Sequence, residues 1–160
     1  MSKVAAKGTR GGERSRGEVP YATTHMVRDC CLCLHVQRAA RALARRFDEV
    51  FRPLDLTNQQ FSLLMSLNRP APPGMTAVAS VLAMDRTTLT AALKPLERRG
   101  LVAVTIDPDD KRGRLIALLP AGRRLLARAL PIWQRTHAEL DVRLGDGGAD
   151  LLRDNLRALA

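Results

Sequence analysis

Residues 85–102, DRTTLTAALKPLERRGLV, combine side chains that could contact a nucleic acid with a spacing that would gather them on one face of a helix. At about 100° per residue, Leu89, Leu93 and Leu96 share one side with Ala92 and would be buried. The opposite face consists of Thr87, Thr90, Ala91 and Lys94. Short side chains let a helix enter a major groove closely, threonine hydroxyls can bond bases or phosphates, and methyl groups can contact thymine.

Two further features favour a DNA-binding interpretation of this helix. Asp85 is a good N-cap, and Arg86 and Thr88 follow it at the positive end of the helix, where phosphate is favoured. The outward face is rich in threonine and nearly free of acid, whereas an ordinary solvated helix face usually carries Glu and Lys. Such a surface helix is the alternative. Pro95 is an irregularity, and it predicts a bend near Ala91 or a distorted final turn.

Residues 107–114, DPDDKRGR, form a loop dense in turn formers, with charges suited to a minor groove. Asp110 stands two residues before Arg112, and we expect its carboxylate to pair with the guanidinium and set its direction. An arginine oriented in this way could enter a narrow minor groove. Lys111 and Arg114 add positive charge to this predicted wing. The alternative is an exposed ion pair in a loop, which contributes about 0–1 kcal/mol.

The overall charge also indicates a polyanionic partner. Lys and Arg number 26 against 16 Asp and Glu, which gives a formal net charge of +10 at pH 7. A basic surface that serves only solubility is the alternative. No apolar run approaches the roughly 20 residues that cross a bilayer. The N-terminus lacks the hydrophobic segment of a secretory signal. We therefore expect a cytoplasmic protein with no membrane partner.

Residue types that could catalyse a reaction or bind a metal are not arranged for either task. Cys30, Cys31, Cys33 and His35 lie close together, but one helix would direct them to different sides and could not bring all four to a single ion. The odd number and tight spacing of the cysteines favour a reducing cytoplasm. No histidine has the partners of a catalytic triad, and no glycine loop is suited to phosphate. We expect no catalytic residues, no metal and no cofactor.

Helices and one hairpin would position these residues. A helix expected at 27–52 is apolar on two faces and therefore needs two packing partners. Thr57 and Gln60 form a capping-box pattern at the next helix, and Pro131 should kink a long later one. The further helices are expected at 57–67, 76–82, 85–99, 121–144 and 149–160, and the strands at 101–106 and 114–119.

This order of elements predicts a winged helix-turn-helix. Ala83 and Met84 form the turn between a short helix and the helix at 85–99, and the β-hairpin that follows is the wing. The fold class is mainly α with a small β-hairpin, or α+β. We assign the DNA-binding domain to residues 53–119 and a flexible basic arm to residues 1–25.

The segments MDRTTLTAALKPLERRGLV, DPDDKRGRLIAL and LPAGRRLL closely resemble the MarR family of bacterial transcriptional regulators, over residues 30–144. The resemblance implies a homodimer joined through residues 26–52 and 120–160, with two winged helices on a pseudo-palindromic operator in double-stranded DNA. It also implies that Arg112 enters the minor groove, oriented by Asp110. The residues that it places in the major groove are Thr87, Thr88, Thr90, Ala91 and Lys94. We expect a cytoplasmic, nucleoid-associated repressor that a small molecule or an oxidant releases from DNA.

The resemblance bears on the releasing signal as well. Aligned through RPLDLTNQQF, Cys33 falls where the peroxide-sensing OhrR-like branch keeps its reactive cysteine. That branch supports the thiolate with tyrosines, whereas the matching residues here are Gln37, Phe47 and Asn58. We therefore favour a buried packing cysteine over a redox-active one.

Regulators of this kind often bind small aromatic effectors. The residues expected to line such a cleft are His35, Phe61, Met65 and Trp133, although Trp133 fits a packing role better. Two alternatives to a specific regulator stay open: an architectural protein that binds DNA of any sequence, and a cysteine-dependent oxidoreductase.

Overall fold

The computed structural model describes residues 17–159, and the structural statements below concern that part of the chain. Its internal contacts divide the chain into two units, residues 1–39 and residues 40–160, and each unit is described by itself. Helix α2, Leu32–Phe51, begins in the first unit and ends in the second.

The first unit contains helix α1, Tyr21–Cys30, and the start of α2. The prediction of one helix from 27 to 52 was wrong, because the backbone is extended at Cys31, with φ −75° and ψ 106°. Residues 21–25, predicted as part of the arm, are helical and follow Pro20, whose fixed φ suits a helix start. Residues 1–16 of that arm lie outside the described residues.

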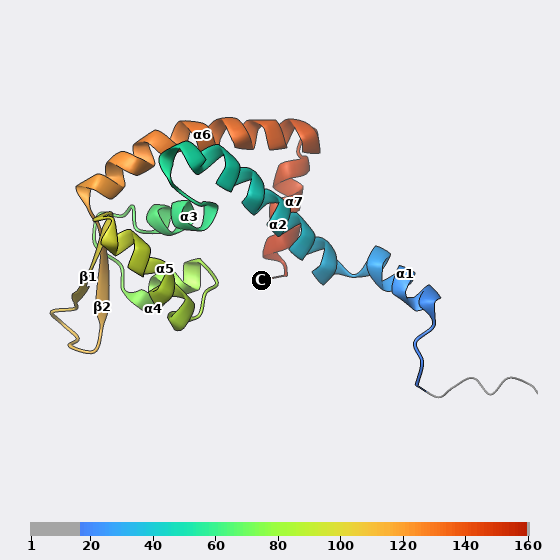
Figure 1. Cartoon of the computed structure of the whole chain (residues 1–160), viewed down its shortest axis with the longest axis horizontal. Coiled ribbons are helices and arrows are strands. Elements are labelled where there is room, and N and C mark those ends of the chain that lie inside the picture. The colour runs from blue at the N-terminus through green and yellow to red at the C-terminus, as the bar shows by residue number, and fades with distance from the viewer. Residues whose placement is uncertain (1–16, 160) are drawn as a thin grey trace, which may run out of the picture. The chain divides into compact units, whose positions relative to one another are not determined.

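The second unit contains the winged helix-turn-helix expected from the sequence, together with long flanking helices (Figure 1). After α2 the elements are η1 (Arg52–Leu54), α3 (Asn58–Ser66), α4 (Met75–Val81), α5 (Arg86–Arg98), β1 (Val102–Ile106), β2 (Arg114–Leu118), α6 (Pro120–Leu144) and α7 (Gly148–Arg157). Both α5 and α6 continue through their internal prolines, so Pro95 and Pro131 break neither helix.

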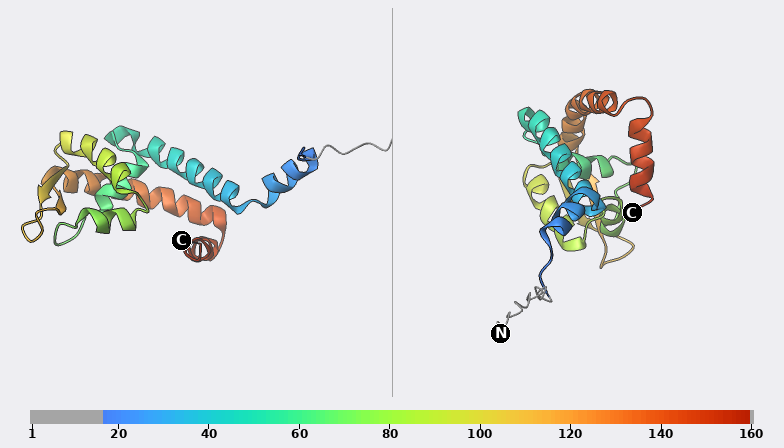
Figure 2. Two further views of the ribbon diagram at one scale, coloured as in Figure 1. Left: turned by 90° about the horizontal axis from the view of Figure 1, so that it is seen from below. Right: turned by 90° about the vertical axis from the view of Figure 1, so that its right-hand side faces the viewer.

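One hydrophobic core holds the second unit together. The C-terminal half of α2 lies alongside α6 (Figure 2), where Arg46 pairs with Glu139 and the rings of Phe47 and His137 are 5.1 Å apart. Burial of one large apolar side chain, such as that of Phe47, stabilises the fold by about 1.5–3 kcal/mol. The core residues with no exposed surface include Phe51, Leu63, Leu64, Val78, Leu89, Leu96 and Ile116.

The capping box predicted at the start of α3 and the tight turn predicted before α5 are both present. Thr57 accepts the backbone N–H of Gln60, and the Gln60 side chain accepts the N–H of Thr57. The turn between α4 and α5 passes through Ala83, whose φ of 50° is left-handed. Because an L-residue with a Cβ adopts this conformation only at a cost, Ala83 is a strained position in the turn.

The wing is an antiparallel hairpin that pairs Val102 with Leu118 and Ile106 with Arg114. The loop before α4 adds to it, since Gly74 bridges Leu115 and the backbone oxygen of Pro73 accepts the N–H of Ile116 at 2.9 Å. This third backbone segment joins the loop end of strand β2 to the helix-turn-helix. The sequence predicts only a loop for this segment.

Candidate nucleic-acid interface

Helix α5 presents the two faces that its sequence predicted. Leu89, Leu93 and Leu96 are buried in the core, and they set the rotation of the helix about its axis. The opposite face is exposed to solvent and consists of Thr87, Thr90, Ala91 and Lys94. Burial of the leucines therefore determines which side chains are available to a partner.

Asp85 caps α5 with both of its carboxylate oxygens. Oδ1 accepts the backbone N–H of Thr88 at 2.8 Å, and Oδ2 accepts the Thr88 hydroxyl at 2.6 Å. These hydrogen bonds stabilise the ionised carboxylate and lower the pKa of Asp85 below its usual value. Arg86 follows at the exposed first position of the helix, where an anionic partner would meet positive charge and free backbone donors.

The threonine hydroxyls are less available than we expected. The hydroxyl of Thr88 donates to Asp85, and the hydroxyl of Thr90 donates to the backbone oxygen of Arg86 at 2.8 Å. Both protons are therefore used within the chain, and these two side chains can offer a partner only an acceptor oxygen or a methyl group. In a complex with DNA, methyl contact with thymine would thus be the stronger role for Thr90.

Aspartate side chains organise the backbone of the wing tip. Asp107 Oδ1 accepts the N–H of Asp109 at 3.0 Å, and Asp110 Oδ1 accepts the N–H of Arg112 at 2.9 Å. Gly113 donates its N–H to the Asp110 backbone oxygen at 2.7 Å, and a Cβ at Gly113 would lie 3.0 Å from that of Asp107. The loop is therefore compact and held by its own short polar side chains.

The expected ion pair between Asp110 and the Arg112 guanidinium is absent from the described residues. Asp110 instead holds the backbone of Arg112, so it shapes the loop and leaves the guanidinium exposed. Lys111 is exposed as well. Arg114 differs from both, because its Nη1 donates to the backbone oxygen of Gly113 at 2.8 Å and anchors the end of the loop.

A hollow of about 240 Å³ lies between α5 and the wing, and cationic side chains from both elements line it. Arg86, Thr90 and Lys94 line it from α5, and Arg114 lines it from β2. Glu97 is the one carboxylate among its lining residues. It was not among the predicted site residues, although it follows Lys94 by one helical turn. Three cations around one carboxylate give a positive field that favours phosphate.

The predicted effector residues meet only in part. Phe61, Met65 and Trp133 line one apolar hollow of about 330 Å³. Val81, Leu82 and Leu130 also contribute to it. His35 is not among the residues that line this hollow. Within the first unit, its Nε2 is 3.1 Å from the Asp29 backbone oxygen.

Trp133 also takes part in a set of aromatic contacts between α2, α3 and α6. Its ring lies 6.3 Å from that of Phe61 and 4.1 Å from that of His137. Burial among these rings lowers the pKa of His137, an effect that Asp141 opposes and Arg153 reinforces. Trp133 therefore packs against the core and also borders the hollow, which fits both roles weighed for it.

The cysteines are free thiols, and Cys33 was expected to be a buried packing residue. Cys30 and Cys33 are exposed and Cys31 is half-buried, so the described chain does not itself bury Cys33. Among residues 17–159, no three His, Cys, Asp or Glu side chains are grouped closely enough to hold a metal ion. No helix in the same range has the length and apolar character needed to cross a membrane.

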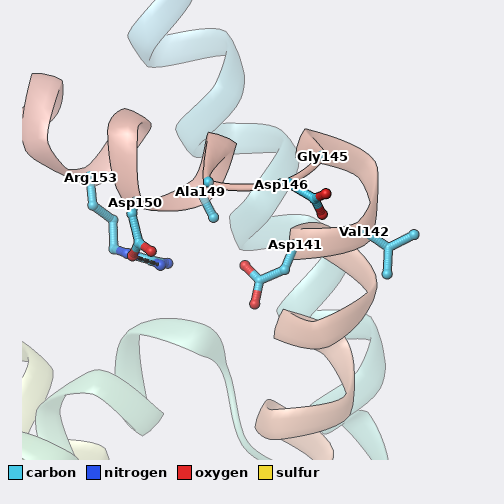
Figure 3. Close-up of a pocket in the computed structure, with 8 residues that line it drawn as sticks. Asp141, Val142, Gly145, Asp146, Ala149, Asp150 and Arg153 are labelled. Atoms are coloured by element: carbon cyan, nitrogen blue, oxygen red, sulfur yellow. Dashed lines mark hydrogen bonds and ion pairs between the residues drawn. The ribbon is translucent and has the colours of Figure 1, made fainter.

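An acidic hollow of about 440 Å³ lies where α6 meets α7 (Figure 3). Asp141, Asp146 and Asp150 line it, and the Asp150 carboxylate lies 2.5 Å from an Arg153 nitrogen. This contact lowers the pKa of Asp150 and raises that of Arg153. A surface with an excess of carboxylates repels phosphate, so this hollow does not belong to the nucleic-acid interface.

Comparison with known proteins agrees with this geometry. The MarR family model matches residues 56–113. The transcriptional regulator HosA of Escherichia coli O111:H- is 34% identical over 107 residues, which cover 66% of this chain and 78% of that protein.

Similar chains have been solved together with DNA. The transcriptional regulator MosR of M. tuberculosis in complex with DNA is 36% identical, with a TM-score of 0.72 over 81% of this chain and 92% of that one. The C80S mutant of MarR from E. coli with operator DNA is 27% identical, with a TM-score of 0.76 over 84% and 96%. On its fold, its family match and its similarity to these regulators, the chain belongs to the MarR family of winged helix-turn-helix transcriptional regulators.

Proposed function

We propose that the protein is a homodimeric repressor that binds a pseudo-palindromic operator in double-stranded DNA. The observation that carries this proposal is the exposed face of α5 formed by Thr87, Thr90, Ala91 and Lys94, backed by three buried leucines. A helix fixed in this way can enter a major groove without reorganising. The DNA complexes of two similar proteins support the same use of the fold here.

Two sets of contacts would have different roles: contacts to phosphates would supply most of the affinity, and contacts to base edges would supply the sequence preference. In the major groove, Lys94 and Arg86 would meet phosphates while short side chains meet base edges. Arg112 and Lys111 would approach the minor groove from the wing, with Asp110 and Arg114 holding the loop in shape. The short side chains at the base edges are Thr87, Thr88, Thr90 and Ala91.

The second copy of the chain would be held by residues 26–52 and 120–160. Large apolar side chains are exposed in this region on α2, on α6 and on α7, and burying them against a second copy would be favourable. The residues concerned include Leu32, Val36, Leu43, Val142, Leu144, Leu151, Leu152 and Leu156. A dimer would place two recognition helices on the two halves of one operator.

Release from DNA would follow a change in the spacing of the two recognition helices. A small aromatic effector is the signal that the structure supports better, because Phe61, Met65 and Trp133 share an apolar hollow. Oxidation of Cys33 is the second candidate, and exposure of its thiol in the described chain favours it. Replacing Cys33 by Ser tests the second candidate, since an unchanged response to organic hydroperoxide would remove Cys33 as the sensor.

We further propose that the protein has no catalytic activity of its own and works on the nucleoid in the bacterial cytoplasm. A transcriptional regulator needs binding and release, and the described residues provide surfaces for both. The two alternatives make different predictions: an architectural protein would bind any duplex, and an oxidoreductase would turn over a thiol substrate without DNA.

Competition binding tests the proposal directly. A labelled duplex recovered by its affinity for the protein is challenged with unlabelled duplex of the same sequence or of random sequence. A specific regulator requires at least about a thousandfold excess of random duplex over specific duplex for equal displacement. A ratio near one would favour the architectural alternative.

A further inference from the structure

A second basic hollow lies on the second unit, away from the exposed face of α5. Its volume is about 410 Å³. Arg99, at the end of α5, and Arg124 and Arg128, on α6, line it. Buried Leu101 and Leu125 line it as well, so guanidinium groups surround a partly apolar floor. No carboxylate is among its lining residues in the described part of the chain.

Arg99 is held in place by the loop that follows η1. Its Nη1 donates to the backbone oxygen of Asp55 at 2.6 Å, and its Nη2 lies 3.6 Å from the Asp55 carboxylate. The Arg99 side chain is only 29% exposed. A guanidinium has five donors, so the donors that Asp55 does not use stay available on a side chain whose direction is already fixed.

Arg124 and Arg128 lie one turn apart on the same face of α6, and both are exposed. Neither forms an ion pair within residues 17–159. Two like charges at this spacing destabilise a helix by about 0.2–0.5 kcal/mol. The first turn of α6 contains no acidic residue, so the positive end of this helix adds to the same field.

This hollow is separate from the proposed DNA-binding surface. Arg99 lies five residues after Lys94, roughly 140° around the helix from it. Figure 1 shows the start of α6 beside the C-terminal end of α5 and the base of the hairpin, away from the hairpin tip. A duplex seated on the threonine face and the wing tip would therefore leave Arg99, Arg124 and Arg128 uncovered.

We propose that this hollow binds a small organic phosphate. Guanidinium groups bind phosphate oxygens through paired N–H donors. Arg124 and Arg128 can together neutralise a doubly charged phosphate ester, and Arg99, whose charge is shared with Asp55, adds its remaining donors. The floor of Leu101 and Leu125 suits an apolar organic group attached to that phosphate. The volume falls within the range of about 300–1,000 Å³ typical of small-molecule sites.

Titration of the full-length protein with phenyl phosphate at constant ionic strength tests this site, with calorimetry as the readout. We expect saturable binding of one probe per chain, and an affinity at least about tenfold lower in the double variant Arg124→Gln, Arg128→Gln. Arg135→Gln is the matched control, because Arg135 is on the same helix but lines a different hollow. It should bind the probe like the wild type.

Two more variants make the result decisive. Arg99→Lys keeps the charge but loses the forked donors, so it should weaken probe binding even if the double variant does not fold. Lys94→Gln, on the α5 face, should leave probe binding unchanged. The proposal is wrong if no saturable binding occurs, if Arg99→Lys and the double variant bind like the wild type, or if Lys94→Gln weakens binding as much as they do.

The same variants separate this site from DNA binding. In the absence of the probe, the double variant should bind the selected duplex as tightly as the wild type. If it instead loses affinity for DNA, the three arginines contact duplex phosphates and the small-molecule assignment is overturned. If Lys94→Gln abolishes DNA binding while the probe still binds, the two surfaces act separately, as we propose.

Discussion

The carboxylate of Asp110 accepts the backbone N–H of Arg112 at 2.9 Å and forms no ion pair with its guanidinium. The sequence had suggested an ion pair, in which the Asp110 carboxylate sets the direction of the Arg112 guanidinium. In the observed arrangement Asp110 determines the path of the loop, and the Arg112 side chain is left free to adopt the conformation that a partner requires. The roles of the two residues can therefore be separated by mutation.

Replacing Arg112 by Ala should weaken operator binding by about 1–3 kcal/mol, because the wing loses the side chain proposed to enter the minor groove. The dimer should persist, since the wing lies outside the regions proposed for dimerisation. Fluorescence anisotropy measures the affinity, and light scattering measures the mass at the same protein concentration. Wild-type affinity in this variant would remove the wing tip from the mechanism.

Replacing Asp110 by Asn should leave DNA affinity close to that of the wild type, because the amide oxygen can still accept the N–H of Arg112. Replacing it by Ala should weaken binding, because the loop loses that hydrogen bond. Anisotropy titrations of the two variants, side by side, provide the test. If Asn is as harmful as Ala, the charge of Asp110 matters and the observed backbone contact does not explain its role.

Replacing Lys94 by Ala should lower both the affinity for DNA and its dependence on salt. Removing one interaction with phosphate from each bound chain reduces the slope of log K against log salt by about 0.9 per chain. Titrations between about 50 mM and 200 mM salt give this slope. A weaker affinity with an unchanged slope would mean that Lys94 does not contact phosphate.

Two substitutions at Thr90 distinguish its methyl group from its hydroxyl. The hydroxyl proton is used by the Arg86 backbone oxygen, so Thr90→Val, which keeps a methyl group in place, should retain most of the affinity. Thr90→Glu places a carboxylate near phosphates and should abolish binding. Gel-shift assays on the selected duplex report both. Loss of binding in the valine variant would show that the Thr90 oxygen is the group that matters.

The stability of the protein should fall as the pH falls below about 6.5, in part through His137. Burial lowers the pKa of His137 in the folded chain, so the unfolded chain binds more protons in the window between the two pKa values. The cost begins below the unfolded pKa and is complete below the folded one. His137→Gln should therefore lose less of its thermal midpoint between about pH 7.5 and pH 5 than the wild type does. An equal loss in both proteins would exclude His137 as a contributor.

The elements that the sequence predicted well are those whose signal is local. The prediction of α5 was correct for its cap and for both of its faces. Asp85 marks the start of the helix, and three leucines follow with the period of a helix. The wing was predicted correctly from a run of turn-forming residues between two short apolar segments. In both cases the decisive residues are near one another along the chain.

The features that the sequence did not predict depend on rotamers or on distant segments. Extended backbone at Cys31 interrupts the first long helix although neither Gly nor Pro is present there. The hydroxyls of Thr88 and Thr90 turn back to their own helix, which residue type alone does not reveal. Arg99 and Arg128 meet at one hollow only because α6 returns past the end of α5.

Selection of bound sequences from a random duplex pool tests the central claim most directly, because it reports specificity and dimer geometry together. We predict enrichment of a sequence with two inverted half-sites, whose centres are about one helical turn of DNA apart. The Thr90→Glu protein should enrich nothing under the same conditions. Recovery of duplexes without a common sequence, or of a single unrepeated half-site, would contradict a dimer that reads DNA through α5.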